Sequence, residues 1–150
     1  MISVARTGER DRADWERLWS QWQAHMHGTV PQAVTDRTWT MLCDGASGLH
    51  ALIARDDEGA ALGFAHVSLT PFAWTGSQIM FLQDLFVAAG ARSDGVGAGL
   101  LRAVYSLADK LGATQVFWMV DEADARLQAF YARHAVRTPY LRYMRQGWPW

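Results

Sequence analysis

The stretch from Gln78 to Leu111 constrains the fold more than any other part of this chain. Residues 78–87 have the length of a strand and carry apolar side chains on both alternating faces. One of these faces is predicted to hold Met80, Leu82, Asp84 and Phe86. A strand with two apolar faces lies inside a sheet that is covered on both sides. Residues 95–111 then repeat apolar side chains at helical spacing, so the sequence predicts a central strand followed by a helix that packs on its sheet.

The other segments are predicted from their apolar periodicity and their bounding turns. Helices are expected over Asp11–His27, Thr35–Cys43 and Asp124–His134. Strands are expected over Ile2–Arg6, Leu49–Arg55, Ala60–Leu69, Gln115–Val120 and Tyr140–Arg145, with Pro71 ending or bending the third of them. The chain shows no repeat or linker, so residues 1–150 are read as a single domain. The order of elements predicts an α/β, or mixed α+β, sheet with helices on both faces.

Composition excludes several classes of protein. Half of the residues are hydrophobic and 19% are charged, which favours a packed core over disorder. The net charge of −1 disfavours a nucleic-acid partner, which usually requires a basic excess. A single cysteine, Cys43, cannot form an internal disulfide or a multi-cysteine zinc site. The sequence has no apolar run of membrane-spanning length and no apolar signal core near Met1, so no membrane role is expected and the cytoplasm is the predicted location.

An anion site is predicted where the long helix begins. Gly95 and Gly97 leave backbone N–H groups accessible at the positive end of the helix dipole, and Arg92 adds a cation. This arrangement suits a pyrophosphate, although a glycine turn that only packs the helix is the alternative. The spacing is not the dinucleotide fingerprint, since Leu100 stands where that motif has Gly or Ala. It is not a P-loop either, because no Gly-Lys-Ser/Thr follows.

Residues 82–97 resemble the GNAT superfamily of acetyl-CoA-dependent N-acetyltransferases, and within it the diamine/polyamine acetyltransferase-like group. The Arg-x-x-Gly-x-Gly of residues 92–97 looks like the pyrophosphate loop of that family, and residues 82–87 look like its Leu-Glu-Asp-Leu-Phe/Tyr-Val strand. Residues 118–131 look like its next strand, loop and helix. The resemblance implies the GNAT-like acyl-CoA N-acyltransferase fold. It also implies direct transfer of acetyl from acetyl-CoA to a primary amine of a small molecule or side chain, with no metal.

The resemblance also implies which residues hold acetyl-CoA. The backbone that would pair with the pantetheine arm is that of Leu85, Phe86 and Val87. The residues that would wrap the pyrophosphate are Arg92, Ser93, Asp94, Gly95, Val96, Gly97 and Ala98. The residues expected beside the CoA arm are Asp124, Ala125 and Arg126. Tyr131 would be the general acid, since a phenol with a pKa of about 10 can protonate a thiolate whose conjugate acid has a pKa of about 8.5. A core tyrosine beside Phe130 is the alternative.

The acceptor side of the site departs from the family. Gln83 stands where the polyamine group has Glu, and an amide cannot act as a base. The base is therefore left open among Asp84, His66, Asp121, Glu122 and bulk water. The loop after the first helix borders the acceptor pocket in this family. The substrate residues are therefore expected to include Trp22, His25, Gln83 and Asp84, with core or rim packing as the alternative for Trp22 and His25.

Two more departures affect the cofactor site. Asp124 replaces the family's Asn, and Asp94 puts a negative charge near the phosphates. These departures and Gln83 motivate a second hypothesis, a non-catalytic acyl-CoA-binding or sensing module on the same fold. A nucleotide-binding module that uses only the glycine turn is a third hypothesis. Dimers are common among similar proteins, so a homodimer is expected.

Overall fold

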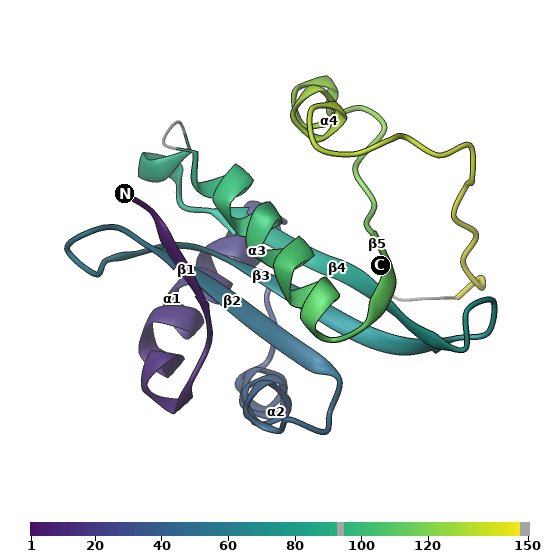
Figure 1. The fold of residues 1–150 in the computed structure, drawn as a ribbon. Coiled ribbons are helices and arrows are strands. Elements are labelled where there is room, and N and C mark those ends of the chain that lie inside the picture. The colour runs from purple at the N-terminus through teal and green to yellow at the C-terminus, as the bar shows by residue number, and fades with distance from the viewer. Residues whose placement is uncertain (93–94, 148–150) are drawn as a thin grey trace. The chain divides into compact units, whose positions relative to one another are not determined.

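The computed structural model describes residues 1–92 and 95–147 and contains one mixed sheet (Figure 1). Its strands are β1 (Ser3–Arg6), β2 (Leu49–Arg55), β3 (Ala61–Phe72), β4 (Ser77–Val87) and β5 (Ala113–Phe117). Its α-helices are α1 (Arg12–His25), α2 (Gln32–Cys43), α3 (Val96–Lys110) and α4 (Ala125–Ala132), with short 3-10 turns at Glu9–Asp11 and Ala89–Ala91. The chain divides into two compact units, residues 1–118 and residues 119–150.

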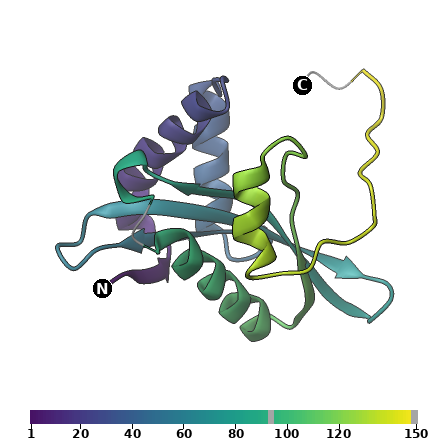
Figure 2. The same ribbon diagram turned by 90° about the horizontal axis from the view of Figure 1, so that it is seen from above.

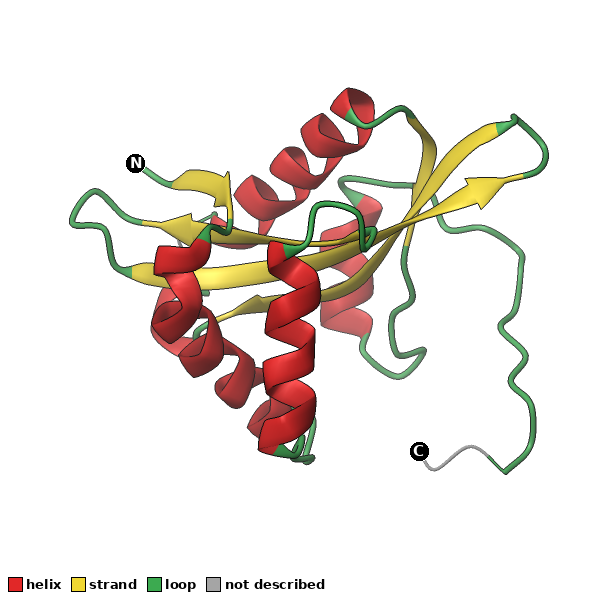
Figure 3. Ribbon diagram, turned by 90° about the horizontal axis from the view of Figure 1, so that it is seen from below, coloured by secondary structure: helices red, strands yellow, loops and turns green. Residues whose placement is uncertain are grey.

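The first unit holds the sheet, in the order β1-β2-β3-β4-β5. The first four strands pair antiparallel to one another, and β5 pairs parallel to β4. Helices α1 and α2 lie on one face of the sheet and α3 lies on the other, as Figure 2 shows from above and Figure 3 from below. The predicted mixed sheet with helices on both faces is therefore confirmed.

Each face has its own apolar core. The core under α1 and α2 contains the buried side chains of Trp15, Leu18, Trp39, Ile53, Phe64 and Phe86. Helix α3 buries a stripe at helical spacing that comprises Val96, Leu100, Leu101, Val104, Leu107 and Ala108. These residues have the predicted helical spacing. The predicted helix, residues 95–111, is one residue longer at each end than α3. No helix in the described part of the chain has the length and apolar character needed to cross a membrane.

A bulge in β4 corrects one prediction about its faces. His66 of β3 pairs with Asp84 and Val67 pairs with Leu82, so Gln83 has no partner in β3. Because neighbouring residues of β3 point to opposite faces, their partners Asp84 and Leu82 also do. Strict alternation had put both on one face. The extra residue instead turns Asp84 and Phe86 toward α1, while Leu82 lies on the face of α3.

Several boundaries also differ from the predicted ones. Helix α2 begins at Gln32 rather than Thr35, since Pro31 already has the φ of −55° that suits a helix start. Strand β3 continues through Pro71. The Leu69 N–H bonds to the Gly48 carbonyl, and beyond Leu69 no described strand pairs with β3 on the side of β2, so the missing N–H of proline interrupts no ladder. Strand β5 ends at Phe117 rather than Val120, and it is partly exposed.

The second unit is small. Asp124 caps α4 by accepting a hydrogen bond from the Leu127 N–H at 2.9 Å, as an acid at a helix start is expected to do. Leu127 itself is exposed. The predicted strand over residues 140–145 is wrong, because these residues have no regular secondary structure. A strand requires a neighbouring strand, and the described residues of this unit contain none.

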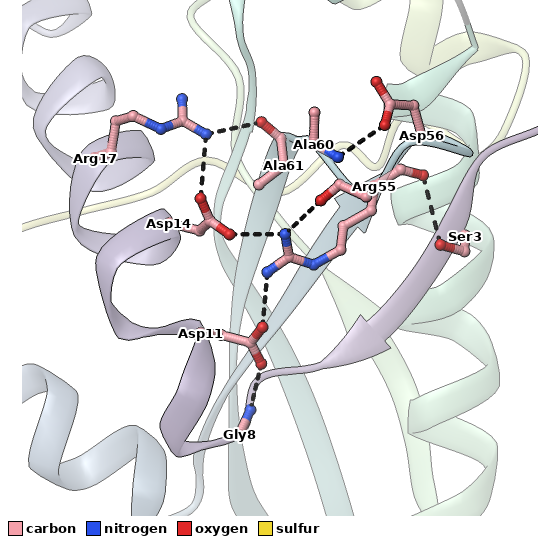
Figure 4. A network of polar contacts seen from close by, with 10 residues as sticks. Ser3, Gly8, Asp11, Asp14, Arg17, Arg55, Asp56, Ala60 and Ala61 are labelled. Carbon is pink, nitrogen blue, oxygen red and sulfur yellow. Dashed lines mark hydrogen bonds and ion pairs between the residues drawn. The ribbon is translucent and has the colours of Figure 1, made fainter.

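Arg55, at the end of β2, ties the sheet to the start of α1 (Figure 4). Its guanidinium donates to Asp11 Oδ1 and Asp14 Oδ2, each at 2.7 Å, and to the Gly59 carbonyl at 2.9 Å. Burial alone would raise the pKa of Asp11. The hydrogen bond from the Gly8 N–H and the Arg55 guanidinium outweigh burial, so the pKa of Asp11 is lowered. The network therefore favours the ionised form of Asp11 where α1 meets β2.

Arg55→Met is expected to lower the free energy of unfolding by about 1–3 kcal/mol, because three acceptors lose a charged donor. Urea unfolding at neutral pH measures this loss, and the exposed Arg10→Met is a matched control expected to change little. The lowered pKa of Asp11 stabilises the fold above its unfolded-state value of about 4, and this contribution is lost as pH falls through the folded-state value. The difference between wild type and Arg55→Met should therefore shrink in acid. A difference that stays constant there would contradict the role given to Asp11.

Candidate active site

Asp84 is the centre of a polar network inside the first unit. Its Oδ1 accepts a hydrogen bond from Trp22 Nε1 at 2.8 Å, and its Oδ2 lies 2.9 Å from His66 Nδ1. Helix α1 supplies Trp22, β3 supplies His66 and β4 supplies Asp84. The bulge at Gln83 makes this possible, since it turns Asp84 toward α1 and opposite His66. The Asp84 side chain is 21% exposed, so the carboxylate is held by the protein but remains accessible.

The network continues inward to Trp15. Trp15 Nε1 lies 2.8 Å from His66 Nε2, so both ring nitrogens of His66 have a partner. Trp15 is fully buried and His66 is 2% exposed. From the sequence, His66 is only one of several candidate bases, and Trp15 is not among the predicted site residues. The available signal was weak, because Trp15 reads as an ordinary core residue of α1.

Trp22, which donates to Asp84, belongs to a cluster of aromatic rings. The Trp22 ring stacks on His25, with centroids 5.7 Å apart and planes 19° apart. The Phe86 ring lies 5.7 Å from that of Trp22 and 6.2 Å from that of His25. The structure therefore brings together three of the four expected substrate residues, Trp22, His25 and Asp84. The fourth, Gln83, is exposed in the bulge.

The end of β4 offers an unpaired backbone edge. Pairing between β4 and β5 covers only Gln78–Phe81 of β4. Among the described residues, no strand pairs with Leu82–Val87 on the side away from β3. Leu85, Phe86 and Val87, predicted to bind the pantetheine arm, lie in this unpaired stretch. Their N–H and C=O groups on that side can pair with an extended amide-bearing ligand.

The start of α3 offers a second group of backbone donors. Gly95 precedes the helix with φ +75°, a left-handed conformation that a residue with a side chain rarely adopts. The N–H of Gly99 bonds to the Gly95 carbonyl, so the N–H groups of Val96, Gly97 and Ala98 precede the first helical hydrogen bond. A side chain added at Gly95 would meet no described residue within 4 Å.

In the sequence, Arg92 lies between these two groups of donors. Its Nε donates to the Val87 carbonyl at 3.3 Å, which ties the loop to the end of β4. The side chain is exposed, so its remaining donors are available to an anion. Ser93 and Asp94, also predicted to wrap the pyrophosphate, lie outside the described residues.

In the second unit, Asp124, Ala125 and Arg126 form the exposed start of α4. Burial, and then the Asp124 carboxylate, raise the pKa of Tyr131 to about 12. Tyr131 therefore keeps its proton across the neutral range and can act as an acid. Asp121, one of the candidate bases, accepts a hydrogen bond from the Ala123 N–H at 2.8 Å in the turn before α4. It and Glu122 are exposed there.

Comparison with known proteins agrees with this geometry. The family model described as "Acetyltransferase (GNAT) family" matches residues 12–135. The D-amino-acid N-acetyltransferase HPA3 of Saccharomyces cerevisiae is 34% identical over 148 residues, which are 98% of this chain and 92% of that protein. An aminoglycoside N(6')-acetyltransferase type 1 of Klebsiella aerogenes is 39% identical over 67 residues, or 43% of each chain. The solved structure of AAC(6')-Iy in complex with a CoA-containing bisubstrate analogue has the same fold. It matches with a TM-score of 0.82 at 22% identity and covers 97% of this chain and 98% of that one.

Proposed function

Because this chain belongs to the GNAT family of acetyltransferases and is an N-acetyltransferase, we propose that it acetylates a small-molecule primary amine from acetyl-CoA, and that Asp84 receives this amine. The observation that carries the proposal is the Asp84 carboxylate, which is held by Trp22 and His66 and is still partly exposed. An amine arrives mostly as an ammonium ion, which a carboxylate and the ring of Trp22 attract. D-amino acids and aminoglycosides, the acceptors in the names of two relatives, are the first amines to test.

Asp84 also has the capacity to take the amine's proton. A carboxylate has about four lone-pair positions, and the hydrogen bonds from Trp22 and His66 use two of them. The ammonium gives one proton to Asp84, and the free amine attacks the thioester carbonyl. The C–N bond forms and the C–S bond breaks. The nitrogen then loses a second proton, so the overall reaction releases one proton to solvent and one to the thiol.

Acetyl-CoA fits the backbone donors of the first unit and supplies the thioester carbonyl. The unpaired edge at Leu85–Val87 suits the amides of its pantetheine arm. The N–H groups of Val96, Gly97 and Ala98, together with Arg92, suit its pyrophosphate. We assign Ser93 and Asp94 to the same loop from the sequence, and Asp124, Ala125 and Arg126 to the CoA arm from the family resemblance.

Tyr131 is the proposed acid for the departing thiolate. Its raised pKa of about 12 supports this role, because the phenol is protonated whenever the enzyme meets a substrate at ordinary pH. The proton that Tyr131 gives to sulfur is replaced by the second proton that leaves the nitrogen. The Asp124 carboxylate contributes by disfavouring the phenolate.

Calorimetric titration with acetyl-CoA tests the cofactor site without knowledge of the acceptor. Wild-type protein is expected to bind acetyl-CoA, and Arg92→Ala to bind it roughly tenfold more weakly, because a charged hydrogen-bond donor is lost. Arg37→Ala, which removes an exposed arginine from α2, is the matched control. NAD and ADP distinguish acetyl-CoA binding from general nucleotide binding.

An amine panel then separates an enzyme from a binding module. Acetylation of a D-amino acid, an aminoglycoside or a polyamine, measured by the release of free CoA thiol, supports the proposal. Binding of acetyl-CoA with no acetylation across the panel would favour the sensing module. Equal affinity for ADP and acetyl-CoA would favour the nucleotide module instead.

The proposal extends to the organisation of the chain. The family match at residues 12–135 includes parts of both units, which supports a single acetyltransferase domain over residues 1–150. A homodimer and a cytoplasmic location remain predictions from the sequence. Light scattering of the purified protein tests the first, and fractionation of the native cells tests the second.

A further inference from the structure

We infer that His66 is a positioning residue, locked by Trp15 in the tautomer that carries its proton on Nδ1, and that it fixes the direction of the Asp84 carboxylate. The inference rests on the proposed function, in which Asp84 receives the acceptor amine. It also narrows the choice of base, because it removes His66 from the candidates.

The tautomer follows from the chemistry of the indole ring. A tryptophan Nε1–H can donate a hydrogen bond but has no lone pair with which to accept one. His66 Nε2, which lies 2.8 Å from Trp15 Nε1, must therefore be the acceptor. A neutral imidazole that accepts at Nε2 carries its hydrogen on Nδ1, and that hydrogen points to Asp84 Oδ2 at 2.9 Å.

The direction of each hydrogen bond excludes His66 as the base in this arrangement. Nδ1 already donates to Asp84, and the lone pair of Nε2 is occupied by Trp15. The ring is also buried, with 2% of its surface exposed, whereas the Asp84 side chain is 21% exposed. An incoming amine therefore meets the carboxylate and not the imidazole.

Two donors from different elements fix the plane of the carboxylate. His66 in β3 donates to Oδ2, and Trp22 in α1 donates to Oδ1. A carboxylate held at both oxygens cannot rotate freely about its terminal bond. The lone pairs that remain therefore point in set directions before the amine arrives, which reduces the reorganisation needed for attack.

The chain offers a matched pair of variants for testing the hydrogen bond from Trp15 to His66. Trp15→Phe keeps a ring in the core but removes the donor to His66. Trp19→Phe is the control, since Trp19 lies in the same helix and its ring also faces His66, at 5.3 Å, but its Nε1 donates to Thr35. Both variants remove one buried or half-buried indole N–H, so a general loss of packing should affect them alike.

The first readout is the tautomer itself. In a two-bond ¹H–¹⁵N correlation spectrum of histidine-labelled protein, His66 is expected to show the Nδ1–H pattern. The chain has five histidines, and the signal that disappears in His66→Asn identifies His66. Trp15→Phe is expected to lose the pure Nδ1–H pattern, whereas Trp19→Phe is expected to keep it. An Nε2–H pattern in the wild type would overturn the inference.

The second readout is kinetic, with an amine that the wild-type enzyme acetylates. Trp15→Phe is expected to lower kcat roughly tenfold, equivalent to the loss of one oriented hydrogen bond, while the KM for acetyl-CoA stays unchanged. His66→Asn can place an amide N–H where Nδ1–H was, so it should retain more activity than His66→Leu. Equal losses in Trp15→Phe and Trp19→Phe, or in His66→Asn and His66→Leu, would overturn the positioning role.

The two readouts separate this inference from the proposed function. The spectrum requires no turnover, so an Nε2–H pattern in an active enzyme would overturn the inference alone. A wild-type protein with the Nδ1–H pattern that acetylates no amine would overturn the proposed function and, with it, the catalytic part of the inference.

Discussion

Asp84→Asn is expected to lower kcat/KM for the acceptor amine by about 10²–10⁴-fold, the usual contribution of a positioned acid or base. The amide has nearly the shape of the carboxylate, but it carries no charge for the ammonium and cannot take its proton. Its NH₂ group would also meet a donor, since both oxygens of Asp84 now accept hydrogen bonds. The measurement is steady-state kinetics with a saturating concentration of acetyl-CoA.

A matched control for this variant is Asp109→Asn, which removes an exposed carboxylate from α3. Calorimetry should show that both variants bind acetyl-CoA as the wild type does. An unchanged kcat/KM in Asp84→Asn would remove Asp84 from the acceptor site and leave the base unassigned.

Tyr131→Phe is expected to lower kcat by about 10²-fold or more, because the departing thiolate loses its proton donor. The affinity for acetyl-CoA should change little, since the aromatic ring remains. With a pKa of about 12, the Tyr131 phenol stays protonated as pH rises through the working range of the enzyme. The activity of the wild type should therefore show no alkaline loss from Tyr131 until the pH approaches that value.

Tyr143→Phe serves as the control, because Tyr143 belongs to the same unit and is 91% exposed. Single-turnover kinetics at saturating substrates would separate the chemical step from product release. If Tyr131→Phe and Tyr143→Phe turned over equally fast, Tyr131 would be a packing residue beside Phe130, at a ring distance of 5.2 Å.

Local patterns predicted the main elements well, because each one was marked by a strong physical signal. The stripe of α3 is apolar at helical spacing, and the left-handed Gly95 stands where the helix begins. An acid at a helix start favours capping, and Asp124 caps α4. The prediction of a strand over residues 140–145 was wrong, because an alternating apolar pattern shows only that a segment is able to pair as a strand. Whether a partner exists depends on distant residues.

The polar network could not be predicted for a related reason. One unpaired residue, Gln83, reverses which face each later side chain of β4 occupies, and nothing in the local sequence marks a bulge there. Without that reversal, Asp84 would lie on the face of α3, away from Trp22 and His66. The hydrogen bond between Trp15 and His66 joins residues 51 positions apart, so it belongs to the tertiary structure alone.

The unpaired stretch of β4, Leu82–Val87, bears on the tendency of the protein to aggregate. An open strand edge attracts strands of other molecules, which is a common first step toward aggregation. A ligand that lies along Leu85–Val87 closes that edge, and a ligand at a hundred times its Kd stabilises a fold by about 2.7 kcal/mol. If acetyl-CoA is that ligand, as proposed, it is expected to protect this protein from aggregation as well as to serve as its substrate. A shortage of acetyl-CoA in the cell would then lower the concentration of folded enzyme as well as the rate of its reaction.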